Sequence, residues 1–142
     1  MKNLLVLFLA GISFFSSSVV VAGFFEEIAD TPVSAFELLT VGEKYDGWRV
    51  RVYGILLFTK DRSLLFVSQD AYRMRDEASS IYLDLSGVSS NILQTLKDAN
   101  GKGVVISGVF QDEKRDRNTG VEMTFGPPYK GRVEVRSLTV LQ

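Results

Sequence analysis

The sequence contains no cysteine and no histidine. The first absence excludes a disulfide framework, a thiol nucleophile and a thiolate metal site. The second excludes a Ser-His triad, an imidazole base and the usual zinc ligand set. A basic excess is also missing, because 16 Lys and Arg residues face 17 Asp and Glu residues. The chain therefore lacks its most versatile catalytic side chains and the positive field with which proteins hold nucleic acid.

The first 22 residues have the layout of a secretory signal peptide. Residues 1–3 (MKN) give a short positive start, residues 4–12 are almost continuously apolar, and residues 20–22 (VVA) place small or branched residues before a cleavage site. We therefore expect cleavage after Ala22. The alternative is an uncleaved anchor, which the serines at 16–18 disfavour because a spanning helix needs about 20 apolar residues.

The length fits one folded domain behind that segment. We expect a signal peptide at 1–22, an N-terminal arm at 23–33 and the folded domain at 34–142. The mature chain would be a bacterial exported protein, periplasmic or secreted, with no membrane span. Loss of Lys2 on cleavage makes its charge balance slightly more acidic.

Alternation of apolar and polar residues predicts five strands, at about 48–58, 64–68, 81–85, 103–110 and 132–141. In the first strand Trp48, Val50 and Val52 share the inward face. After Gly54 the pattern becomes apolar on both faces, which indicates a bend where one strand serves two sheets. The last strand changes phase near Arg136, which predicts a bulge.

A short helix is predicted at about 35–40. Ser34 is a suitable N-cap, and Glu37 follows it at the capping-box spacing. This helix is expected to bury Phe36 and Leu39.

A second helix is predicted from Ser89 or Ser90 to about residue 99, where the apolar residues follow helical spacing. The charged segments 69–80 and 111–131 are expected to be loops.

The predicted elements follow the order strand, strand, strand, helix, strand, strand. This order predicts a mainly β fold, a five-stranded OB-fold-like barrel with a helix between strands 3 and 4 and a short N-terminal helix. The bend in the first strand and the phase slip in the last both favour closure of a small barrel. The alternative is a small α+β sandwich or a half-open roll.

Residues 34–39 (SAFELL) and 43–54 (EKYDGWRVRVYG) resemble the opening of small exported bacterial OB-fold modules of unknown function. In those modules an EKYDGxRVRVxG segment is followed by a hairpin and a WLDL-type strand, which residues 81–85 match. Val41-Gly42 stands here in place of Asn-Pro, and Trp48 in place of Lys. The resemblance covers about 34–110 and implies the fold without an activity.

Carboxylates are the strongest acid-base candidates in the chain. Asp112, Glu113 and Asp116 crowd the last loop, and Asp76 and Glu77 lie in an earlier one. A hydrolase would need a pair held about 5–10 Å apart in a cleft, and no motif places these groups so. Calcium binding at 112–120 is disfavoured because three basic residues would repel the ion. We expect no cofactor, no metal and no catalytic residue.

Aromatic and cationic residues gather in the expected loops. In an OB-fold these loops rim one face, where aromatic rings stack on sugars or bases and arginines pair with anions. The simpler interpretation is that such aromatics only pack a loop onto the barrel. The candidate ligand-binding residues are Lys60, Arg62, Tyr72, Arg73, Arg75, Tyr82, Phe125, Tyr129 and Lys130.

The predicted fold, the predicted signal peptide and the lack of catalytic groups together predict a non-catalytic binding or adaptor module of the bacterial envelope. Its expected partner is an envelope protein or glycan. One alternative is an oligonucleotide-binding protein, which export and the charge balance disfavour. Another is a hydrolase that acts through carboxylates, with or without a metal.

Overall fold

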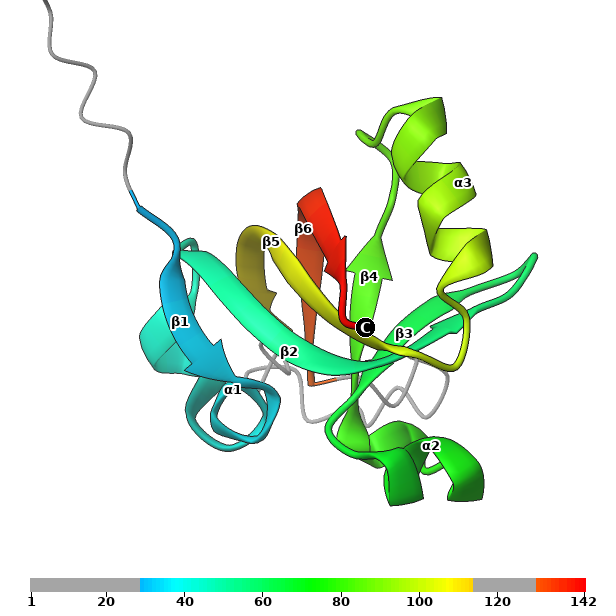
Figure 1. Cartoon of the computed structure of the whole chain (residues 1–142). Helices are drawn as coiled ribbons and strands as arrows, with labels where there is room; N and C mark the ends of the chain where they lie inside the picture. Colours follow the sequence, from blue (N-terminus) through cyan, green and yellow to red (C-terminus); the bar gives the residue numbers. More distant parts are fainter. Residues whose placement is uncertain (1–28, 114–129) are drawn as a thin grey trace, which may run out of the picture.

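Six strands and three α-helices follow one another in residues 29–113 and 130–142, the part of the chain that this computed structural model describes. Figure 1 shows the helices placed around a strongly curved sheet. In chain order the elements are β1 (Thr31–Ser34), α1 (Ala35–Val41), the 3-10 helix η1 (Gly42–Tyr45), β2 (Arg49–Phe58), β3 (Ser63–Phe66), α2 (Gln69–Met74), the 3-10 helix η2 (Glu77–Ser79), β4 (Ser80–Asp84), α3 (Ser90–Asp98), β5 (Gly103–Asp112) and β6 (Gly131–Val140).

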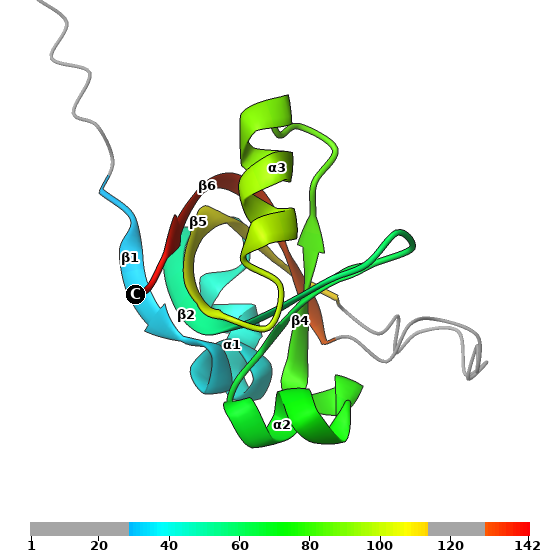
Figure 2. The same ribbon diagram turned by 45° about the vertical axis from the view of Figure 1, so that its right-hand side comes forward.

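Five of these strands close into a barrel. Around the ring the order is β2, β3, β4, β6 and β5, and β5 pairs again with β2. β4 and β6 run parallel, whereas the other neighbours in the ring run antiparallel. Figure 2 shows β2, β5 and β6 curving around one interior. This order, with α3 between the third and fourth barrel strands, is the OB-fold, so the predicted fold class is confirmed.

β2 changes partners where its sequence pattern changes. Its residues Arg49 to Ile55 pair with β5, and Ile55 to Phe58 pair with β3. Gly54 lies at the changeover, where an added Cβ would come within 2.6 Å of the Leu65 side chain and of the Phe66 carbonyl oxygen. The predicted double role of this strand is confirmed, and the glycine is there because the neighbouring strand passes so close.

The predicted bulge in the last strand is also confirmed. Ser107 pairs with Ser137 and Gly108 pairs with Val135, so Arg136 is the extra residue on β6. A bulge increases the local twist and lets a strand turn a barrel corner.

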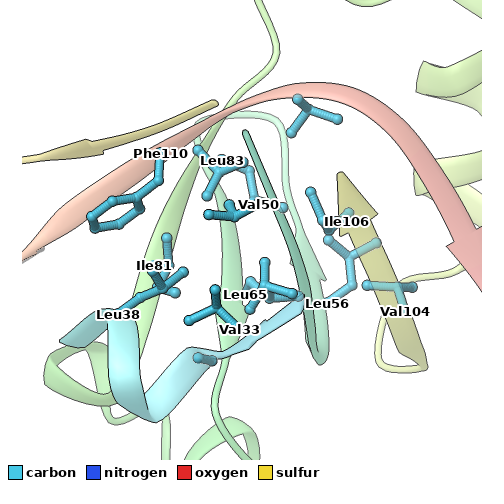
Figure 3. Close-up of a cluster of buried hydrophobic side chains, with 14 of the residues drawn as sticks. Val33, Leu38, Val50, Leu56, Leu65, Ile81, Leu83, Val104, Ile106 and Phe110 are labelled. Carbon is cyan, nitrogen blue, oxygen red and sulfur yellow. The ribbon is translucent and has the colours of Figure 1, made fainter. Parts of the chain in front are cut away.

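The barrel interior is filled by the inward residues of every strand. Val50 and Leu56 on β2, Leu65 on β3 and Ile106 on β5 are fully buried, and Figure 3 shows them converging with Phe110. The amphipathic helix α3 adds Leu96 to the same core, as its helical spacing predicted.

A second apolar cluster lies on the opposite face of the β2–β3 hairpin. Because side chains alternate along a strand, Ile55, Leu57, Leu64 and Phe66 point away from the barrel interior and pack with Ala71 of α2. This explains why the second half of β2 is apolar on both faces.

The orientation predicted for α1 is wrong. Ser34 caps the helix as expected, accepting a hydrogen bond from the Glu37 N–H at 3.0 Å. With the helix beginning at Ala35, however, Ala35 and Leu38 face the core, and Phe36 is 68% exposed. Leu39 is only partly buried.

Trp48 was also expected to face inward, and it is 49% exposed. It precedes the first residue of β2, beyond the tightly packed core. Its ring meets Tyr45 edge-on, with centroids 5.7 Å apart.

One α-helix and one strand were not predicted, and neither were the two short 3-10 helices. The expected loop at 69–80 contains α2, whose N-cap Ser68 accepts a hydrogen bond from the Ala71 N–H at 3.1 Å. The expected arm at 23–33 contributes to β1, which pairs parallel with β2 along Val50 to Tyr53. An ion pair between Arg49 and Asp30, 3.0 Å apart, fixes the entry to β1.

Within residues 29–113 and 130–142, none of the helices has the length and apolar character needed to span a bilayer.

Candidate functional site

The turn between β2 and β3 projects from the barrel (Figure 1) and is held by hydrogen bonds within the turn. The Thr59 N–H and the Thr59 hydroxyl each donate to the Arg62 carbonyl oxygen at 2.9 Å. The Arg62 N–H in turn lies 3.2 Å from the Thr59 hydroxyl oxygen. These bonds hold Lys60 and Asp61 at the tip.

The base of this hairpin is tied to the segment after α3. The Phe58 N–H donates to the Asn100 side-chain oxygen at 2.9 Å. The Gly101 N–H donates to the Leu56 carbonyl at 2.8 Å, and the Leu56 N–H donates to the Lys102 carbonyl at 3.0 Å. The turn and the end of α3 therefore keep a defined relative position.

Two open hollows flank the turn. The first, of about 460 Å³, is lined by Phe58, Thr59, Lys60 and Lys97. The second, of about 340 Å³, is lined by residues 58–63 of the hairpin, residues 82–86 around the end of β4, and Leu93 of α3. Both hollows are shallow and open to solvent, and they are bounded by the hydrogen-bonded turn and the elements beside it.

The second hollow brings together three of the predicted site residues, Lys60, Arg62 and Tyr82. Arg62 forms an ion pair with Glu77 of η2, which ties the turn to the segment before β4. Tyr82 is half-buried and packs against the second apolar cluster.

Asp84 supplies a fixed negative charge to the same hollow. Hydrogen bonds from Ser86, whose N–H lies 3.0 Å from Asp84 Oδ1, hold the pKa of this carboxyl below its ordinary value, and nearby Arg132 acts in the same direction. Asp84 is therefore ionised at neutral pH and unsuited to donate a proton.

The other described site residues line neither hollow, although Tyr72 packs against the same apolar cluster as Tyr82. Tyr72, Arg73 and Arg75 belong to α2 and its C-cap, and Figure 1 shows α2 and α3 at opposite ends of β4. The Tyr72 ring meets Phe66 edge-on, with centroids 5.8 Å apart, and the Arg75 guanidinium lies 4.6 Å from the Tyr72 centroid. Both contacts are internal to the fold.

The remaining predicted residues belong to the segment before β6. Lys130 is exposed, and its carbonyl accepts a hydrogen bond from the Glu113 N–H at 3.1 Å. Phe125 and Tyr129 lie outside the described residues, as does the candidate acid Asp116.

Sequence reasoning did not place Phe58, Asp84 or Lys97 among the candidate binding residues, although all three line a hollow. Phe58 was predicted only as the end of a strand, and Lys97 falls within the helix predicted to about residue 99. The sequence around Lys97 does not reveal that the β2–β3 hairpin lies beside α3. This placement depends on the hydrogen bond between Phe58 and Asn100, which are distant in sequence.

The described residues contain no group of three or more acidic side chains placed to hold a metal ion. The carboxylates of the earlier loop are held in local contacts, with Asp76 accepting from the Ser79 hydroxyl at 2.6 Å and Glu77 paired with Arg62. The Asp112 N–H donates to Asp46 Oδ1 at 3.0 Å, a contact that fastens the end of β5.

No family model matches the chain, and no curated protein matches it. Among solved structures, the telomere capping protein Ten1 from Saccharomyces pombe is 14% identical over 79% of this chain and 81% of that one, with a TM-score of 0.48. An OBody bound to hen egg-white lysozyme is 12% identical, over 80% of this chain and 96% of that chain, with a TM-score of 0.49. A DUF3299 family protein from Pseudomonas aeruginosa is 9% identical, over 80% and 97%, with a TM-score of 0.43. The fold assignment rests on the strand order described above.

Proposed function

We propose that this chain is an exported, non-catalytic binding module of the bacterial envelope that holds a protein or glycan ligand beside the β2–β3 turn. The observation that carries this proposal is the second hollow, where Arg62, Tyr82 and Asp84 face one concave space from fixed positions. OB-folds bind through their second and third strands and adjoining loops, which are here β3, β4 and the β2–β3 turn.

The charges around the turn favour this function over the two alternatives. Asp61 and Asp84 share the second hollow with Lys60 and Arg62, so the surface lacks the positive excess that nucleic acid binding requires. For a hydrolase, the ionised Asp84 would need a second carboxyl that can act as an acid. Export is supported by the apolar N-terminal segment alone.

A site-specific photo-cross-linker tests the proposed surface in the intact envelope. Placed at Asp61, at the tip of the turn, it should yield one discrete cross-linked species, because the ligand covers that tip. The matched control is Glu43 in η1, an exposed acid at the start of a turn remote from the hairpin in sequence. Protease or glycan-hydrolase treatment then tells a protein ligand from a glycan.

The variant Tyr82→Ala should weaken cross-linking at Asp61 without unfolding the protein. Equal cross-linking from Asp61 and Glu43, or capture that survives loss of Tyr82 and Arg62 together, would contradict the proposed surface.

A further inference from the structure

Two lysines from different elements line the first hollow. Lys60 lies at the tip of the β2–β3 turn and Lys97 in the last turn of α3, and Phe58 lines the same hollow. Neither ammonium group has a carboxylate partner among residues 29–113 and 130–142. Two like charges on one small space repel each other, and an anion between them would replace that repulsion by attraction.

The neighbouring acids do not supply that anion. Asp98, next to Lys97, accepts a hydrogen bond from the Gln94 amide at 3.2 Å. Glu77 pairs with Arg62, and Asp61 lines the second hollow but not the first. The first hollow is therefore cationic, while the second carries both signs.

We propose that the first hollow is an anion subsite that receives the carboxylate of an acidic residue in a peptide segment of a partner protein. The inference rests on the proposed binding function and names the class of ligand. Phe58 also lines this hollow and offers apolar contact to a side chain next to the acid. Lysine suits this role because its ammonium is a compact charge with three donors.

The adjoining hollow favours a peptide over a polyanion. A nucleic acid strand presents a phosphate at every nucleotide, so some phosphates would face Asp61 and Asp84 in the second hollow. A peptide can place one carboxylate between the lysines and neutral or basic residues beside these two acids. Charge complementarity across both hollows thus selects an acidic residue with uncharged or basic neighbours.

Blocked pentapeptides of the form Gly-X-Asp-X-Gly, with Phe, Leu or Tyr at X, test this inference against matched peptides that carry Asn in place of Asp. Amide NMR titration of the purified protein should show shifts at residues 58–62 and at Lys97 with the Asp peptides. The Asn peptides should bind about tenfold more weakly, because they lose a charge-assisted hydrogen bond. Added salt should narrow that difference.

Lysine variants test whether the preference for Asp peptides arises at Lys60 and Lys97. The double change Lys60→Gln and Lys97→Gln should weaken the Asp peptides about tenfold and leave the Asn peptides unchanged, since only the charged partner is lost. Lys60→Arg with Lys97→Arg should retain preference for Asp. Lys44→Gln removes the same charge at η1, where Lys44 lies over the Tyr45 ring, and serves as the control. Thermal unfolding of each variant shows that the fold is intact.

The outcomes separate this inference from the function on which it rests. Equal binding of Asp and Asn peptides at the hollows overturns the anion subsite and leaves the binding surface standing. Absence of shifts with every Asp peptide also overturns the subsite, whereas the cross-linking at Asp61 still decides the proposed function. Tighter, salt-sensitive binding of oligothymidylate at the same residues overturns both.

Discussion

Glycine is needed at two points of the barrel because a backbone passes too close for a side chain. An added Cβ at Gly108 would lie 2.1 Å from the Glu134 carbonyl oxygen, and one at Gly54 would lie 2.6 Å from the Phe66 carbonyl oxygen. Neither glycine has a positive φ, so close approach is the cause. Contacts with a neighbouring backbone cannot be relieved by turning a side chain.

Gly108→Ala should therefore lower the free energy of unfolding, by about 2–3 kcal/mol, because the bulge must open to admit a methyl group. Urea unfolding measures this change. Gly87→Ala is the matched control, since an added Cβ there has nothing within 4 Å; its effect should stay within about 0.5 kcal/mol. Similar losses in the two variants would contradict the role given to the bulge.

Asp84 should make the stability depend on pH. Its pKa in the folded protein is lowered from 3.8, mainly by the hydrogen bonds from Ser86. A lowered pKa contributes stability that is fully present above the unfolded-state pKa and is lost as the pH falls through the folded-state value. Asp84→Asn should thus destabilise the protein more at pH 7 than at about pH 2. A pH-independent difference in urea unfolding would contradict this assignment.

At the scale of elements, α2 is held by contacts rather than by its own helix propensity. Six residues are too few for an isolated helix, so the stability must come from the Ser68 cap and from packing on the second apolar cluster.

Tyr72→Ala should accordingly lower the free energy of unfolding by about 1–3 kcal/mol, because it removes the edge-on contact with Phe66. Met74→Ala is the control on the same helix, since Met74 is 80% exposed. A Tyr72→Ala protein of unchanged stability that no longer binds its ligand would restore Tyr72 as a ligand contact.

Elements whose residues repeat a clear pattern could be predicted from the sequence alone. The barrel strands and α3 follow periods of two and 3.6, and the changeover at Gly54 and the bulge at Arg136 were visible as breaks in those patterns. β1 gave no such signal, because Val33 is the one buried side chain in its four residues. Its extended form depends on pairing with β2, which is distant in sequence.

The candidate site was predictable only in part for the same reason. Lys60, Arg62 and Tyr82 were identified and do lie together. Tyr72, Arg73 and Arg75 line neither hollow, although Tyr72 packs against the same apolar cluster as Tyr82. No local pattern reveals this, because it follows from the way α2 packs on the barrel. Lys97 joins the site through a hydrogen bond between Phe58 and Asn100, residues 42 positions apart.

At the scale of the whole molecule, the proposed export of this OB-fold makes a prediction about processing. Export predicts that the protein recovered from the envelope begins at Gly23, because signal peptidase cuts after small residues such as Ala22. Intact-mass measurement of the recovered protein tests this, and Ala22→Arg should leave the precursor uncut. A mature chain that retains residues 1–22 would contradict cleavage and support the anchor.

The closed barrel also fixes where a ligand can act. The interior is filled by side chains, so binding must use the outer surface and its loops. Of that surface, the β2–β3 turn combines hollows, exposed charges and internal hydrogen bonds. The central claim is that ligand contacts are confined to this turn and the elements beside it.

Amide NMR of the purified protein tests that claim most directly, with a panel of envelope glycan fragments, the acidic pentapeptides, calcium and oligothymidylate. We expect a glycan or peptide ligand to shift the amide resonances of residues 58–63, residues 82–86 and Lys97, and to leave the amides of α2 unchanged. Shifts caused by a glycan or peptide ligand and centred on Tyr72 to Arg75 would contradict that claim.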